Sequence, residues 1–127
     1  PRKADARPRV AETENNSGDS ATAAGDRASA TESHGRALGL FEEITAADPA
    51  NVRAQVGKAR MYESLGTAAE AGAGRAGERR TARSWYEKSR ATYIDLQNRG
   101  LLGGETAQEL AAVSRKLVAV NGGPAAP

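Results

Sequence analysis

Residues 37–44, ALGLFEEI, and residues 82–89, ARSWYEKS, repeat one pattern at two places in the chain. In each copy an alanine is followed four positions later by an aromatic ring, Phe41 or Tyr86. Three positions later again stands Ile44 or Ser89. A pattern that recurs after roughly 20 to 50 residues is typical of solenoids built from helical hairpins, in which each unit buries its apolar face against its neighbours. We therefore expect an array that holds partners on an extended surface.

Apolar residues recur at helical spacing around both copies, and no stretch alternates as a strand would. Asp48-Pro49 ends the first helix, Asn51 is suited to cap the next one, and Gly100 is suited to end the third. The predicted fold class is all-α, with about four helices packed as antiparallel hairpins. The predicted helices cover about residues 33–47, 51–71, 78–98 and 105–120, with a glycine-rich loop at 71–77.

The two ends of the chain lack the apolar residues that a core needs. Val10 is the single large aliphatic residue before position 33, so we expect residues 1–32 to be a disordered linker and 121–127 a disordered tail. The predicted domain is 33–120. We read the chain, which starts at Pro1 rather than at a methionine, as part of a longer protein.

The predicted core is thin, because only 39% of residues are hydrophobic and 4% aromatic, and much of the hydrophobic share is alanine. The side chains expected to be most buried are Phe41, Tyr62, Trp85, Tyr86 and Leu110.

Composition excludes several kinds of site. The chain has no cysteine, which rules out disulfides and thiolate metal sites. A net charge of +2 is too small to indicate nucleic acid. No window approaches the length of an apolar membrane span, and no signal peptide is visible, so we expect no membrane segment and a cytoplasmic location.

No residue stands out as catalytic, cofactor-binding or metal-binding. His34 is the only histidine and is expected at a solvated helix start. Glu42, Glu43 and Glu78 are expected on polar surface, away from a pocket that would shift their pKa values. Gly72-x-Gly74-x-x-Gly77 has the spacing of a dinucleotide loop, but no strand precedes it. We predict a non-enzymatic chain without cofactors, although a catalytic domain upstream would be compatible with it.

The third predicted helix is basic, and it supports an alternative function. Its surroundings carry Arg75, Arg79, Arg80, Arg83, Lys88 and Arg90. Such a stripe binds anions or nucleic acid when aromatic rings are exposed between the charges. Here Trp85, Tyr86 and Tyr93 fall on the apolar face, so a solvated surface is favoured over this alternative.

Several of these positions together resemble the tetratricopeptide repeat. Ala37, Phe41 and Pro49 have the spacing of a small residue, an aromatic ring and a closing proline in the second helix of that repeat. The next first helix is similar at Ala59, Tyr62 and Leu65-Gly66, and Ala82, Tyr86 and Ser89 repeat the second-helix pattern. The chain departs from the family at Gln55 and Lys58, at Ile94 in place of the closing proline, and in a longer loop before Glu78.

A narrower resemblance covers about residues 36–119. The stretch from Ala82 to Ser89, followed by Leu96-x-x-Arg99-Gly100-x-Leu102 and a last amphipathic helix, looks like the C-terminal end of repeat regions attached to bacterial serine/threonine kinases and adenylate cyclase-type regulators. No kinase motif is present in this sequence.

The repeat resemblance implies a partner-binding groove lined by the first helix of each hairpin. Carried over by position, the groove candidates are Asn51, Arg53, Val56, Arg60, Glu63 and Ser64. Their arginines, carboxylate and amide suit a polar or acidic peptide. The implied partner is a protein, a peptide or another domain of the same parent chain. A purely structural role, as the capping end of a longer array, is equally compatible with the sequence.

Overall fold

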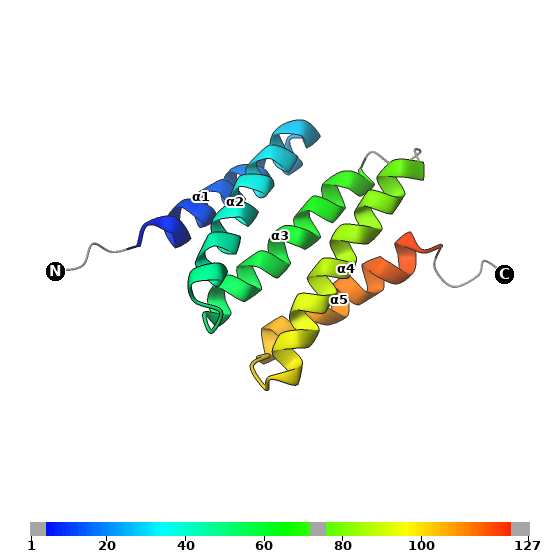
Figure 1. Ribbon diagram of the computed structural model, residues 1–127. Coiled ribbons are helices and arrows are strands. Elements are labelled where there is room, and N and C mark those ends of the chain that lie inside the picture. Colours follow the sequence, from blue (N-terminus) through cyan, green and yellow to red (C-terminus); the bar gives the residue numbers. More distant parts are fainter. Residues whose placement is uncertain (1–4, 72–75, 123–127) are drawn as a thin grey trace.

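The computed structural model describes residues 5–71 and 76–122, and within them the protein consists of five α-helices without strands. The helices are α1 (Arg7–Ala23), α2 (Arg27–Ala47), α3 (Val52–Glu70), α4 (Ala76–Asn98) and α5 (Gly104–Val120). Consecutive helices are antiparallel, and α3 lies in the middle of the array (Figure 1). The all-α fold class is therefore confirmed.

Helices α2 to α5 occupy the segments predicted from apolar spacing. Asn51 caps α3 as expected, since its side chain accepts a hydrogen bond from the Ala54 backbone N–H at 3.0 Å. Gly100 adopts φ +70° after α4, and the Leu101 N–H then reaches the Leu96 carbonyl at 2.9 Å. This bond satisfies a carbonyl that the end of the helix would leave unpaired. Of the predicted loop at 71–77, residues 72–75 lie outside the described residues, and Gly77 belongs to α4.

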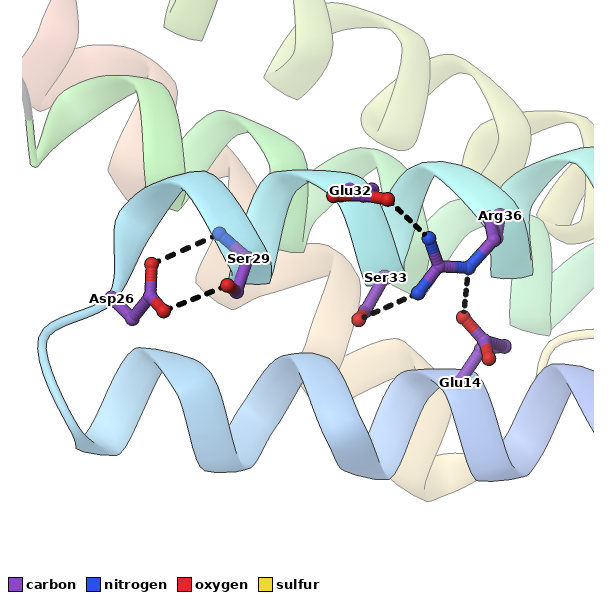
Figure 2. Close-up of polar contacts among 6 residues, drawn as sticks. All are labelled: Glu14, Asp26, Ser29, Glu32, Ser33 and Arg36. Carbon is purple, nitrogen blue, oxygen red and sulfur yellow. Dashed lines mark hydrogen bonds and ion pairs between the residues drawn. The ribbon is translucent and has the colours of Figure 1, made fainter.

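The N-terminal segment differs from the expected disordered linker. Residues 1–4 lie outside the described part of the chain, but Arg7–Ala23 form α1, and α2 begins at Arg27, six residues earlier than predicted. Gly25 ends α1 with φ +78°, and the Asp26 N–H bonds to the Ala21 carbonyl at 2.8 Å. Asp26 then caps α2 by accepting from the Ser29 N–H and hydroxyl (Figure 2). A glycine followed directly by an aspartate thus closes a tight hairpin.

Two hydrophobic clusters form the core, and α3 contributes to both. One joins α1, α2 and α3 through Ala11, Phe41, Ile44, Met61 and neighbouring residues. The other joins α3, α4 and α5 around Tyr86, Tyr93, Leu96 and Val113. Each helix packs mainly against its neighbours in sequence. Stability is therefore distributed along the array rather than gathered at one centre.

The predicted core list is correct for two of its five members. Phe41 and Tyr86 are buried, at 9% and 1% exposure, whereas Tyr62, Trp85 and Leu110 are only partly buried. Trp85 lies on the flank of α4 and stacks on Tyr62, with ring centroids 5.9 Å apart. Leu110 is only partly buried because α5 is the last helix and packs mainly on α4.

Candidate functional site: a groove between α1, α3 and α5

A groove of about 660 Å³ runs between α1, α3 and the first turn of α5. Because consecutive helices are antiparallel, these three helices are parallel to one another, and their N-termini lie at the same end of the molecule (Figure 1). Residues from all three first turns line the groove, including Pro8, Arg9, Arg53 and Thr106. Helix N-termini carry partial positive charge, so this end of the groove favours a negatively charged group.

The floor of the groove is apolar. Phe41 and Ile44 from α2 and Val52, Val56 and Met61 from α3 contribute to its lining. Phe41 reaches the groove because Gly57 on α3 has no side chain: a Cβ atom there would lie 2.5 Å from Phe41 Cε1. The close approach of α2 and α3 thus places an aromatic ring beneath the groove.

The rim of the groove carries arginines that differ in how firmly they are paired. Arg60 donates two hydrogen bonds to Glu109 on α5, at 2.8 and 3.1 Å, and these bonds raise its pKa. The Arg53 side chain is 93% exposed and meets Glu12 only at 3.7 Å. Arg9 is exposed, and no ion pair to its guanidinium is recorded among the described residues. Arg9 and Arg53 are therefore the rim cations with most freedom to bind a ligand.

The structure brings four of the six groove candidates together. Asn51, Arg53, Val56 and Arg60 line the groove, although Asn51 is also the cap of α3 and Val56 is largely buried. The other two lie further along α3 and outside the lining. Of these, Glu63 pairs with Lys116 of α5 at 3.2 Å, and Ser64 is half-buried.

The sequence interpretation missed the wall that α1 supplies. Asp5, Pro8, Arg9, Glu12 and Asn15 line the groove from this side. The Asp5 carboxylate accepts a hydrogen bond from the Arg7 guanidinium, which lowers the pKa of the carboxyl. Apolar spacing does not reveal α1, because its buried residues are Ala11 and Gly18. The signal that would have revealed it is the pair Gly25-Asp26, which joins a helix C-terminus to a helix N-cap.

His34 and the three glutamates considered as candidates lie outside the groove lining. His34 is buried in the middle of α2, not solvated at a helix start, because α1 covers it. Glu42 and Glu43 are exposed as predicted, while Glu78 is partly covered and lies 3.6 Å from Arg27. The glycine motif falls mostly outside the described residues.

The basic residues of α4 lie on its surface. Arg79, Arg80, Arg83, Lys88 and Arg90 are exposed, and Arg75 lies outside the described residues. Tyr86 and Tyr93 are buried, and Trp85 is covered by Tyr62 and Lys88. The exposed aromatic platforms that single-stranded nucleic acid stacks on are thus not formed by these three rings.

Neither a metal-binding cluster nor a membrane-spanning helix is found in the described part of the chain. No group of three or more His, Cys, Asp or Glu side chains there is arranged to hold a metal ion. None of the described helices combines the length and hydropathy needed to cross a bilayer.

Comparisons with known proteins give no match. No family model matches the chain, and neither curated proteins nor solved structures show significant similarity to it.

Proposed function

We propose that this chain is a non-catalytic protein-interaction module that holds an acidic peptide in the groove between α1, α3 and α5. The observation that carries the proposal is the composition of the groove: an apolar floor beneath Arg9 and Arg53, two arginines that are not firmly paired. Its volume of about 660 Å³ accommodates a few side chains of a partner.

Charge complementarity selects the acidic partner. Carboxylates bind arginine through charge-assisted hydrogen bonds that are stronger than neutral ones. The positive ends of three helices add to the same field. An apolar side chain of the peptide would cover the floor at Val52 and Phe41, while its carboxylates meet the rim.

The order of the helices also supports this proposal. The resemblance to tetratricopeptide hairpins predicts that the first helix of each hairpin lines the binding surface, and α1, α3 and α5 have this place in the array. As part of the same proposal, the module belongs to the repeat region of a bacterial signalling protein, as the narrower resemblance implies.

Fluorescence anisotropy with three labelled peptides tests the proposal. The peptides share their length and apolar residues and carry glutamate, glutamine or lysine at the remaining positions. The glutamate peptide should bind most tightly, and Arg53→Glu should weaken it by about tenfold or more, the effect of about 1.4 kcal/mol. Arg80→Glu makes the same change in net charge on the exposed face of α4, and it should leave the affinity nearly unchanged.

Two results would contradict the proposal. Equal binding of all three peptides would remove the argument from charge complementarity. Binding of random DNA that falls steeply with salt and is abolished by Arg79→Glu with Arg83→Glu would instead support the alternative, an anion- or nucleic-acid-binding surface on α4.

A further inference from the structure

Helix α1 packs closely along α2, and its own buried side chains in this interface are small. Its buried residues are Ala11 and Gly18, and its one large aliphatic side chain, Val10, is 46% exposed. Because hydrophobic stabilisation follows the apolar area buried, the side chains of α1 contribute little of it themselves, and most of the buried apolar area at this interface belongs to α2. The docking of α1 therefore depends both on the α2 side chains that it covers and on the polar contacts between the two helices.

The imidazole of His34 lies inside this interface, against the C-terminal half of α1. The residue is 1% exposed, and a Cβ atom at Gly18 would lie 2.6 Å from its Cε1, so the ring packs directly against the α1 backbone. Its Nδ1 is buried without a hydrogen-bond partner in the described structure. Its Nε2 is 3.7 Å from an Asp19 carboxylate oxygen, which is beyond hydrogen-bonding distance.

Asp19 on α1 is the charged group recorded against His34 among the described residues, and its side chain is 63% exposed. A second polar contact across the interface is made by Arg36. Its guanidinium bonds to Glu14 of α1 and to Glu32 and Ser33 of α2 (Figure 2). A protonated His34 would thus bury a charged N–H donor at Nδ1 without an acceptor, which strongly disfavours that form.

We propose that His34 is a pH-sensitive latch: its protonation releases α1 from α2 and removes the α1 wall of the groove. Asp5, Pro8, Arg9, Glu12 and Asn15 would leave the groove together, because all lie in or next to α1. The proposed release of α1 is argued only from the contacts between α1 and α2. Its effect on partner binding rests on the proposed function of the groove.

The direction of the pH effect follows from proton linkage. Burial lowers the pKa of His34 below its ordinary value of 6.5, and the charge on Asp19 opposes this only in part. The released form therefore binds more protons below pH 6.5 than the docked form does. Docking is fully stable above that pH and weakens as the pH falls, by at most about tenfold per pH unit for a single proton.

Nuclear magnetic resonance of the whole chain tests the latch without any peptide. His34 is the only histidine, so its Cε1–H signal reports one imidazole. Between about pH 7.5 and about pH 5, this signal and the α1 amide signals should titrate together, with a midpoint below the ordinary histidine value of about 6.5. Amide signals of α4 should keep their positions.

Two variants serve as controls. His34→Gln cannot be protonated, so its α1 signals should not depend on pH. Asp19→Asn removes the charge that favours protonation in the docked state, so α1 should be released more readily at a given acid pH. If His34→Gln leaves α1 undocked at every pH, two other results still test the latch. These are whether His34 and the α1 amides share one midpoint in the wild type, and whether Asp19→Asn releases α1 more readily in acid.

The latch is wrong if His34 titrates without a change in α1, or if the α1 signals of His34→Gln keep the wild-type pH dependence. The glutamate peptide separates this proposal from that of the groove. If binding of the glutamate peptide weakens in acid for the wild type and does not depend on pH for His34→Gln, both the latch and the groove are supported. If the peptide fails to bind at any pH while α1 still titrates with His34, the proposed function fails and the latch stands.

Discussion

At the scale of single residues, three glycines allow neighbouring helices to approach until a ring meets a backbone. A Cβ atom would lie within 2.6 Å of the His34 ring at Gly18, within 2.5 Å of Phe41 at Gly57, and within 2.6 Å of Tyr86 at Gly66. A ring that lies flat on a glycine backbone makes van der Waals contacts over its whole face. These contacts are important for stability in a chain that has few aromatic residues. The fold therefore depends on glycines inside helices, where propensity alone would disfavour them.

Gly57→Ala tests this dependence. The new methyl group would collide with Phe41, so we expect the free energy of unfolding to fall by about 1–3 kcal/mol in urea titrations followed by circular dichroism. Gly35→Ala is the matched control, because a methyl group on this α2 glycine would meet no neighbouring atom within 4 Å. It should gain up to about 1 kcal/mol from helix propensity. A gain at both positions would show that the Phe41 contact yields easily.

At the scale of helices, the sequence predicted best where large apolar residues recur and where an end is marked by a cap. Helices α3, α4 and α5 lie within two residues of their predicted bounds at each end, and Asn51 and Gly100 have the predicted roles. Helix α1 was not predicted, because alanine and glycine contribute little to hydropathy even when they are buried. The burial of His34 was missed for the same reason, since it depends on α1 being present.

Substitutions at Asn51 test whether the side chain of this groove residue stabilises α3 as its N-terminal cap. Its side chain accepts from the Ala54 N–H, so Asn51→Ala should lower the free energy of unfolding by about 1 kcal/mol. Asn51→Asp retains a capping oxygen and should stay near wild type. Comparing the two by chemical denaturation isolates the cap. If both variants are equally unstable, the amide makes a contribution that the cap does not explain.

At the scale of the whole molecule, the helices form a chain of neighbouring contacts with α3 as the link. Helix α5 is additionally tied to α3 by the Arg60–Glu109 and Lys116–Glu63 pairs. Four of the groove candidates taken from the repeat resemblance line the groove on the α3 side, because their spacing places them within one helix. The wall supplied by α1 was not predicted, because it arises from a long-range arrangement that local spacing does not encode.

This architecture predicts that α1 opens separately from the centre of the array. Ala11 is fully buried, and Ala11→Asp would place a carboxylate there at a cost that releases the helix. Amide hydrogen exchange should then show lost protection in α1 and retained protection in α3 and α4.

Leu96→Ala, in the cluster of α3, α4 and α5, should instead lower the free energy of unfolding by about 2–5 kcal/mol and lower amide protection throughout that cluster.

Hydrogen exchange at neutral pH distinguishes this arrangement from a single cooperative unit. If Ala11→Asp lowers protection in α4 as much as in α1, the five helices unfold together, and a latch at His34 would open the entire molecule rather than one wall of the groove. If protection falls in α1 alone, α1 can leave α2 without unfolding the rest of the array. Protonation of His34 is then expected to shift the docking of α1 without unfolding α3, the helix that carries Arg53 and Arg60.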